Sequence, residues 1–233
     1  MRIGILADIH GNIFAFEKVI KSLKKEELDM YIFSGDICGY YYYQDEIIDV
    51  LRGMENLKCI AGNHDRFFLE TLKDPSLAIA YEEEHGKSLS LLKDKIKEDN
   101  LSFIKGLSDK WVSDEYGIAV FHGSPWDHLN EYIYPDSSFE KFEDLPYRYI
   151  ILGHTHHPMD VSVGGVRVIN PGSCGQPRDY NEPSYAVLDT ERDLVEIRRI
   201  KYDVDLMIKE VMRRKEKNPL LVEVLQREGS RSV

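Results

Sequence analysis

Apolar runs alternate with amphipathic stretches along the N-terminal part of the chain. Residues Arg2 to Ala7 form an apolar, β-rich run that ends at Asp8, and Asn12 then precedes a stretch with helical periodicity. The apolar positions of that stretch, which fall on one face of a helix, are Phe16, Val19, Ile20 and Leu23. The pattern predicts a strand, a turn and a helix, in that order.

The same order is then repeated. Met30 to Phe33 is predicted as a strand that ends at Ser34-Gly35-Asp36, and residues 45 to 54 are predicted as a helix. Leu57 to Ala61 is predicted as a third strand, and it ends at Gly62-Asn63-His64-Asp65. Strands that alternate with helices form parallel sheets, and ligands bind outside the carboxyl ends of such strands. All three predicted strands are followed by polar residues at that end.

The remainder of the chain has a different pattern. Residues 66 to 109 show helical patterns, which we expect to lie over one side of the site. Short β-type runs then return, and the Gly164-Gly165 pair predicts a hairpin turn. These runs are Gly117 to Phe121, Tyr149 to Leu152, Asp160 to Val163, Val166 to Ile169, Ser184 to Leu188 and Leu194 to Ile200. Residues 203 to 215 and 219 to 227 are predicted as helices, and residues 229 to 233 are expected to fray.

A second half with more strands than helices predicts two mixed sheets packed together, with helices outside, in an α/β fold. We see no repeat, low-complexity tract or linker. We therefore expect residues 1–233 to form a single domain, with a helical insertion at about 66–109 and closing helices at about 203–227. With 233 residues and 42% hydrophobic content, such a chain can bury a core without disulfides.

Charge and cysteine content narrow the class of protein. The net charge of -11 disfavours a broad surface for duplex nucleic acid. Because we see neither a signal peptide nor an uncharged run of membrane-spanning length, we expect a cytoplasmic protein that does not associate with membranes. The cysteines, Cys38, Cys59 and Cys174, show no Cys-x-x-Cys spacing and are expected to be reduced.

Potential metal ligands follow the predicted strands. Asp8 and His10 alternate on a segment that we expect to be extended, which would point both side chains to the same side. Asp36 has two carboxylate oxygens and can bridge two cations, although a turn or a helix cap is an alternative role for it. His154 and His156 are again one residue apart after a strand, so both can reach the same site.

Asn63 and His122 complete the ligand set. Asn63 offers a carbonyl oxygen, whereas the adjacent His64 points elsewhere on the same turn. Two carboxylates, one amide oxygen and four imidazoles exceed the needs of one ion, so we expect two divalent cations. Any one of these histidines would more simply be a core or surface residue, but five of the eight lie in these turns. The others are His85, His128 and His157, and we expect His157 to lie outside the first coordination shell.

In this order, the segments resemble the calcineurin-like metallophosphoesterase superfamily. They are Asp-x-His-Gly at 8–11, Gly-Asp at 35–36, Gly-Asn-His-Asp at 62–65, His-Gly at 122–123 and Gly-His-Thr-His at 153–156. The resemblance spans residues 1 to about 200 and implies a four-layer α/β/β/α sandwich, which agrees with the strand count. It also implies that His64 is the acid that assists the leaving group. The implied ligands are Asp8, His10, Asp36 and His156 for one metal, and Asp36 as bridge with Asn63, His122 and His154 for the other.

Two departures narrow the choice within the superfamily. Protein serine/threonine phosphatases continue their Gly-Asp segment into Asp-Arg-Gly, which supplies an arginine that clamps phosphate. Here the chain continues as Ile37-Cys38-Gly39-Tyr40, without that arginine. The segment from Asn170 to Asp179 resembles the prokaryotic phosphodiesterase-like branch instead.

Three further residues are candidates for catalysis or substrate binding. Asp65 could hold the imidazole of His64 charged, or it could cap the helix that follows. Arg178 suits a phosphate, with pairing to Asp179 or to a backbone carbonyl as the alternative. Tyr40, the first of four consecutive tyrosines, could stack on a nucleobase or pack in the core.

We therefore expect a metal-dependent phosphoesterase that hydrolyses a phosphodiester, nucleotide or phosphomonoester bond by attack of a hydroxide bridging two metal ions. Manganese is the first expectation, with iron, zinc, cobalt, nickel or magnesium as alternatives. The expected partner is a small phosphoester or nucleotide, and the oligomeric state is left open. The alternatives are a non-catalytic binding scaffold on the same fold, as in a retromer subunit, and a nuclease of the same superfamily.

Overall fold

The first sheet combines the N-terminal strands with two strands from the C-terminal part of the chain. The structure, a computed structural model, describes residues 1–227. The strands are β1 (Arg2–Leu6), β2 (Met30–Phe33), β3 (Leu57–Cys59), β9 (Ser184–Asp189) and β10 (Leu194–Arg199), in the spatial order β10-β9-β1-β2-β3. As the alternation with helices predicted, β1, β2 and β3 run parallel. The last two strands are antiparallel additions, because β9 pairs in that sense with both β1 and β10.

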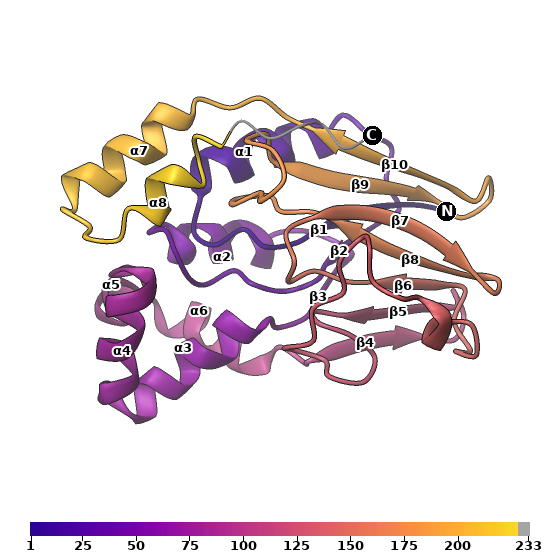
Figure 1. Ribbon diagram of the computed structural model, residues 1–233, viewed down its shortest axis with the longest axis horizontal. Coiled ribbons are helices and arrows are strands. Elements are labelled where there is room, and N and C mark those ends of the chain that lie inside the picture. The colour runs from indigo at the N-terminus through magenta and orange to yellow at the C-terminus, as the bar shows by residue number, and fades with distance from the viewer. Residues whose placement is uncertain (228–233) are drawn as a thin grey trace.

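The second sheet faces the first and is also mixed (Figure 1). Its strands are β4 (Lys110–Ser113), β5 (Ile118–Phe121), β6 (Tyr149–Ile151), β7 (Pro158–Val163) and β8 (Val166–Pro171), in the spatial order β4-β5-β6-β8-β7. β5, β6 and β8 run parallel, and the predicted hairpin joins β7 to β8. The two packed mixed sheets confirm the predicted fold class. Edge strand β4 was not predicted, because its Lys-Trp-Val-Ser sequence has no clear apolar run.

The helices gather at one end of the sheets (Figure 1). They are α1 (Ile13–Leu23), α2 (Gln44–Arg52), α3 (Asn63–Lys73), α4 (Pro75–His85), α5 (Ser88–Lys95), α6 (Glu98–Gly106), α7 (Val204–Arg213) and α8 (Leu220–Glu223). None of the helices in residues 1–227 is long and apolar enough to cross a membrane. α3 begins at Asn63, earlier than predicted, and α8 spans only part of the predicted 219–227 segment. The predicted fraying at 229–233 lies outside the described residues.

Apolar side chains fill both faces of the first sheet. Ile3 and Ile5 of β1 point into a core shared by both sheets, where they join Ile118 and Ile151 of the second sheet. Leu6 lies in a different core, which the first sheet shares with the helices. Because β1 is buried on both faces, its sequence is a continuous apolar run and does not alternate between apolar and polar residues.

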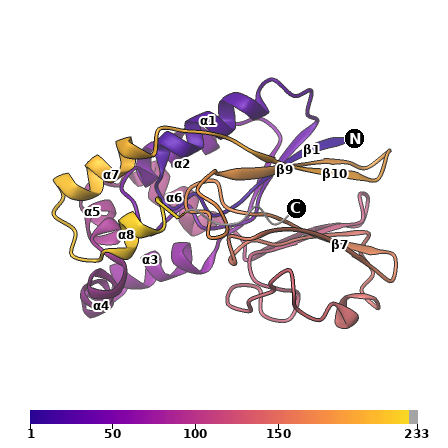
Figure 2. The same cartoon turned by 45° about the horizontal axis from the view of Figure 1, so that its top comes forward.

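A long connection covers the outer face of the second sheet. Between β5 and β6 the chain contains only the short 3-10 helix η1 (Glu140–Phe142). Ile133 and Phe142 of this connection pack against Phe121 and Ile150 of the sheet. The layer outside this sheet is therefore mostly loop, as Figure 2 shows, whereas α-helices cover the first sheet.

Two isoleucines in helices should contribute very differently to stability, because only one of them lies in the core between the helices and the first sheet. Ile48 of α2 is fully buried, whereas Ile79 of α4 is 65% exposed. We expect Ile48→Ala to lower the free energy of unfolding by about 2–5 kcal/mol, because it leaves a cavity in the core. Ile79→Ala is the matched control and should change it little. Chemical denaturation of both variants measures the difference, and equal effects would contradict the assigned core.

Candidate metal centre and active site

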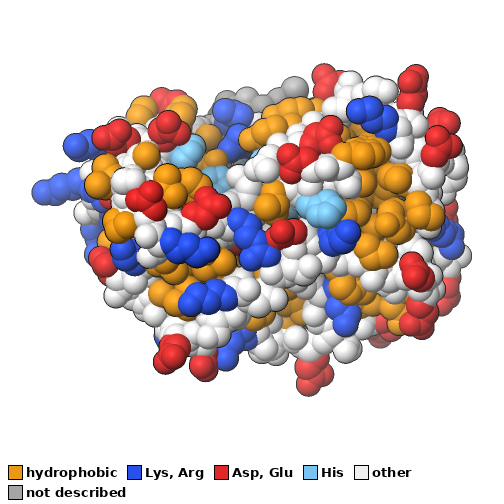
Figure 3. Space-filling view, turned by 90° about the horizontal axis from the view of Figure 1, so that it is seen from below, with side chains coloured by type: hydrophobic (Ala, Val, Ile, Leu, Met, Phe, Trp, Pro, Cys, Tyr) orange, Lys and Arg blue, Asp and Glu red, His pale blue; other side chains and the backbone are white. Residues whose placement is uncertain are grey.

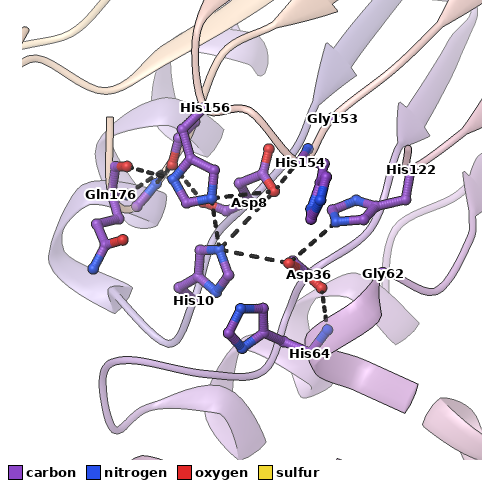
Figure 4. A network of polar contacts seen from close by, with 12 residues as sticks. Asp8, His10, Asp36, Gly62, His64, His122, Gly153, His154, His156 and Gln176 are labelled. Atoms are coloured by element: carbon purple, nitrogen blue, oxygen red, sulfur yellow. Dashed lines mark hydrogen bonds and ion pairs between the residues drawn. The ribbon is translucent and has the colours of Figure 1, made fainter. Parts of the chain in front are cut away.

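Loops at the carboxyl ends of parallel strands from both sheets meet in one place. Asp8 follows β1, Asp36 follows β2 and Asn63 follows β3, while His122 follows β5 and His154 follows β6. Figure 4 shows these loops converging, with the aspartate and histidine side chains pointing toward one another. The structure thus brings together all seven residues that the sequence proposed as metal ligands.

The first cluster combines Asp8, His10 and His156. Their potential ligand atoms all lie within 4.8 Å of one another. The Nε2 atom of His156 lies 3.6 Å from the nearer carboxylate oxygen of Asp8, and Nε2 of His10 lies 3.9 Å from the same oxygen. All three side chains are buried. A small cation could therefore contact three donors at once.

The second cluster combines Asp36, His122 and His154, also within 4.8 Å. Nε2 of His122 lies 3.2 Å from Oδ2 of Asp36 and 3.0 Å from Oδ1 of Asn63. Oδ2 of Asp36 also lies 3.7 Å from Nε2 of His10 in the first cluster. The two clusters are contiguous, and Asp36 stands between them.

Backbone carbonyls orient the histidine rings. A carbonyl oxygen can only accept a hydrogen bond, so the ring nitrogen facing it must carry the proton. In three rings Nδ1 donates in this way and leaves the lone pair of Nε2 facing the clusters: His10 to Cys38 at 2.7 Å, His156 to Gln176 at 2.6 Å and His122 to Ser34 at 2.8 Å. In His154 the two nitrogens have the opposite roles. Its Nε2 faces the Asn130 carbonyl at 3.2 Å, so Nδ1 is the nitrogen with the free lone pair. Metal-binding histidines are commonly oriented by such contacts.

Two observations test whether these residues fit metal ions. Oδ2 of Asp8 and Oδ2 of Asp36 are buried without a hydrogen-bond partner in the described part of the chain. Nε2 of His10 also faces Nε2 of His156 at 3.1 Å, although both rings carry their proton on Nδ1. Buried anionic oxygens and opposed lone pairs are unfavourable unless a cation lies among them. The residues therefore fit the binding of divalent cations.

Burial and neighbouring charges shift the pKa values of these groups. Burial lowers the pKa of His10 and His156, and it lowers that of His154 to about 3, so these rings stay neutral ligands. Burial also raises the pKa of Asp8 to about 8, and a cation beside it would favour the carboxylate. At His122, burial lowers the pKa, but the Asp36 carboxylate outweighs this effect and raises the pKa to about 9. A cation that binds Nε2 of His122 would therefore have to displace the proton of that nitrogen.

The backbone of the ligand loops is not extended, which corrects one prediction. Asp8, His10, Asp36, His154 and His156 all have positive φ values, between 49° and 67°. The reason given for pairing Asp8 with His10, two side chains on one side of an extended segment, was therefore wrong. Left-handed turns instead separate His154 from His156 and send them to different clusters.

Asp65 does not contact His64, so its assignment as the partner of that histidine is wrong. The buried carboxylate accepts hydrogen bonds from four backbone N–H groups, at 2.9 to 3.1 Å: those of Gly62, Asp36, Ile37 and Cys38. Its position at the third residue of α3 makes it a helix cap, as the alternative held. Asp65 thereby fixes the Asp36 loop against the start of α3.

The close approach of these two loops requires a glycine. A Cβ atom on Gly62 would lie 2.0 Å from Oδ1 of Asp36, which also accepts the backbone N–H of His64 at 2.9 Å. Any side chain at position 62 would thus displace the carboxylate that links the two clusters.

Tyr81 of α4, rather than an acid, contacts the imidazole of His64. The distance from the Tyr81 hydroxyl to Nδ1 of His64 is 2.9 Å. Within residues 1–227, Nε2 of His64 has no hydrogen-bond partner, and the ring lines a cavity beside the clusters. Burial lowers the pKa of His64 to about 4, so the ring is neutral. With Nδ1 accepting the phenol proton, Nε2 carries the proton that it can donate.

Arg178 and Tyr40 contact each other beside the first cluster. Nη2 of Arg178 donates to the Tyr40 hydroxyl at 2.9 Å, and the Tyr40 ring meets the His10 ring edge-on at 4.6 Å. Asp179 pairs with Arg199 instead, so the alternative pairing of Arg178 with Asp179 is wrong. The structure places Tyr40 at the site, whereas the next two tyrosines pack in the core.

The three remaining histidines lie outside the clusters. The ring of His157 packs against Tyr134, and that of His128 against Phe121. His85 lies near Tyr81 and the His64 ring, in the wall of the adjacent cavity.

A family model for the calcineurin-like phosphoesterase superfamily domain matches residues 1–193. This chain belongs to that superfamily. Its members are phosphoester hydrolases that depend on metal ions. The clusters described here supply several groups of aspartate and histidine residues that could bind such ions.

Two relatives of this chain come from the same archaeon. An uncharacterized protein of Methanocaldococcus jannaschii is 30% identical over 224 residues, which cover 87% of this chain and 88% of the relative. A phosphodiesterase of the same organism is 28% identical over 200 residues, covering 82% and 95%. The crystal structure of a metallophosphoesterase from Sphaerobacter thermophilus superposes with a TM-score of 0.81 at 24% identity, covering 97% and 99%. That structure supports the fold.

Sequence reasoning did not find two residues that shape the candidate site. Tyr81 lies in the helical insertion, and no local pattern links it to His64. Asn170 donates to the carbonyl of Gly153 and to the hydroxyl of Thr155, and so holds the loop that carries two histidine ligands. Asn170 begins the segment that carried the resemblance to phosphodiesterases, so a signal for it was present.

The contacts of Asp65 predict that the metal loops depend on its carboxylate. In Asp65→Asn one oxygen is replaced by an NH2 group that cannot accept, which leaves at least one buried N–H unpaired. We expect a loss of stability of about 1–3 kcal/mol and weaker metal binding. Asp74→Asn is the control, because Asp74 caps α4 at an exposed position where asparagine caps equally well. Thermal unfolding and metal titration measure both effects, and equal behaviour of the two variants would contradict this role.

Proposed function

We propose that this chain is a phosphodiesterase that uses two divalent cations, with manganese as the first choice, to hydrolyse a small phosphodiester or nucleotide. The observation that carries the proposal is the position of Asp36. Its unpartnered Oδ2 lies between His10 at 3.7 Å and His122 at 3.2 Å, as a carboxylate that bridges two cations requires. The relative from Methanocaldococcus jannaschii that is named a phosphodiesterase supports the choice of diesters over monoesters.

Each cluster would hold one cation. Asp8, His10 and His156 would contact the first, and Asn63, His122 and His154 the second, with Asp36 contacting both. When bound, two divalent cations lower the pKa of a coordinated water and neutralise charge on the phosphoryl oxygens. A phosphate anion would thus be attracted to one local site on a protein whose net charge is -11.

The protein supplies the proton for the leaving group. Nε2 of His64 can give its proton to the leaving oxygen if Nδ1 takes up the phenol proton of Tyr81 in the same step, which keeps the ring neutral. A proton delivered to the leaving oxygen prevents the release of a high-energy alkoxide. Arg178, whose Nη2 is held by Tyr40, places its guanidinium beside the site for contact with an anionic oxygen.

Metal dependence provides the first test. Purified protein supplied with Mn²⁺ should hydrolyse bis(p-nitrophenyl) phosphate faster than p-nitrophenyl phosphate, and a chelator should abolish both activities. Asp36→Asn should lower kcat by about three orders of magnitude and reduce the metal content, because it removes the shared ligand. Asp99→Asn, at an exposed position on α6, is the control. Absence of hydrolysis with all six candidate metals would favour a binding scaffold on the same fold.

The role of His64 provides a second test. His64→Ala should lower kcat by about 10²–10⁴-fold for alkyl leaving groups and much less for p-nitrophenol, with metal content retained. Tyr81→Phe should lower kcat about tenfold in the presence of His64, and should have no effect on kcat in His64→Ala. Tyr149→Phe, which removes a hydroxyl bonded to Asp193, is the control. Additive effects of the His64 and Tyr81 substitutions would show that Tyr81 does not act through His64.

A further inference from the structure

A cavity of about 800 Å³ adjoins the candidate metal centre. Asn63 and His64 lie in its wall, and the remaining wall comes from α3, α4, α8 and several loops. Residues of α8 line the cavity together with residues of α3 and α4, and Figure 1 shows α8 apart from those two helices. In the view from below, neighbouring histidine side chains are visible in the helical half of the molecule, with basic side chains beside them (Figure 3). Both the helical insertion and the C-terminal helix therefore help to build this space.

We infer that this cavity binds the leaving group of the substrate, and that this group is a nucleotide, an alcohol with an organic ring and a phosphate of its own. The inference rests on the proposed function and specifies the substrate class. In the hydrolysis, water adds to phosphorus, the bond from phosphorus to the leaving oxygen breaks, and that oxygen takes up a proton. The metal ligand Asn63 and the proposed proton donor His64 both line the cavity, so the group attached to the leaving oxygen would lie there.

The walls of the cavity favour an organic group. Tyr81 and Phe67 form an aromatic wall, with ring centroids 5.4 Å apart. Leu220, Leu221 and Val224 of the C-terminal segment form an apolar wall. Pockets of roughly 300–1,000 Å³ with such walls bind organic ligands rather than single ions. A methyl or other small leaving group would leave most of the space filled with water.

Arg178 indicates that the leaving group also carries an anion. Nε of Arg178 is buried and has no hydrogen-bond partner among residues 1–227, although Nη2 of the same guanidinium donates to Tyr40. A buried N–H of a cation is unfavourable without an acceptor, and phosphate is an acceptor that matches guanidinium geometry. The backbone is fixed as well, because Arg227 donates to the Arg178 carbonyl at 2.7 Å.

The other charged residues of the cavity do not compete for this role. Arg66 is paired with Asp109 at 2.5 Å. Glu70, Glu84 and Arg227 are exposed, so solvent screens their charges. Among the described lining residues, Arg178 therefore offers the cationic donor that lacks a partner and is shielded from solvent.

A matched pair of dinucleotides tests the inference. Thymidylyl-(3′→5′)-thymidine and its 5′-phosphorylated form differ only in the terminal phosphate. We expect the phosphorylated form to have a KM about tenfold lower, as one charge-assisted contact can provide. Two molecules of thymidine 5′-phosphate should be its only products, because the leaving oxygen is then the 3′-oxygen of the nucleotide that carries the terminal phosphate. Release of thymidine and a 3′,5′-bisphosphate would overturn the assignment.

Two variants separate the contributions of Arg178 and the walls. In Arg178→Gln the KM advantage of the terminal phosphate should disappear, and Arg178→Lys should restore part of it. Ala80→Trp should fill the cavity and raise the ratio of the KM of the phosphorylated dinucleotide to that of bis(p-nitrophenyl) phosphate about tenfold. Ile79→Trp, at an exposed neighbouring position outside the lining, should leave the ratio unchanged.

These outcomes are separable from failure of the proposed function. If the protein does not hydrolyse bis(p-nitrophenyl) phosphate, the phosphodiesterase proposal itself fails. If it does, but the terminal phosphate gives no advantage or the advantage survives in Arg178→Gln, the assignment of the cavity is overturned and the phosphodiesterase proposal stands.

Discussion

A buried carboxylate at the junction of the two sheets is the group on which the site depends. Asp36 follows β2 in the first sheet, and its Oδ2 meets His122, which follows β5 in the second. A buried anion is costly unless positive charge or hydrogen bonds balance it, and no hydrogen bond reaches this oxygen. The loops around Asp36 are accordingly arranged to present donors and further ligands. Their geometry is consistent with the need to balance one buried charge.

That arrangement stores strain in the backbone. Five residues of the two clusters have left-handed φ values, and each such residue costs roughly 1–2 kcal/mol when it is not glycine. Hydrogen bonds between loops offset part of this cost. The Asp65 carboxylate holds four backbone N–H groups, and three carbonyls fix histidine rings. The ligands are thus held in position by contacts that do not involve a metal ion, which is the preorganisation that a catalytic site needs.

The position of the site could be predicted from the sequence, whereas most contacts between its side chains could not. Apolar runs located the strands, and the carboxyl ends of parallel strands located the ligands from Asp8 to His156. The extended geometry assumed for Asp8 and His10 was wrong, because loops that pack against one another adopt turns that strand periodicity cannot describe. Asp65 lies next to His64 in sequence, yet its carboxylate turns to backbone groups on another loop. Tyr81 reaches His64 through the packing of α4, and no sequence spacing encodes that contact.

Neither cluster can be completed by one sheet alone. Asp8 and His10 come from the first sheet and meet His156 from the second, while Asp36 from the first meets His122 and His154 from the second. Each cation would therefore cross-link the two halves of the sandwich. Metal binding would therefore require the two sheets to be packed in the correct alignment. A substitution in the core between the sheets could abolish metal binding without changing any of the ligands.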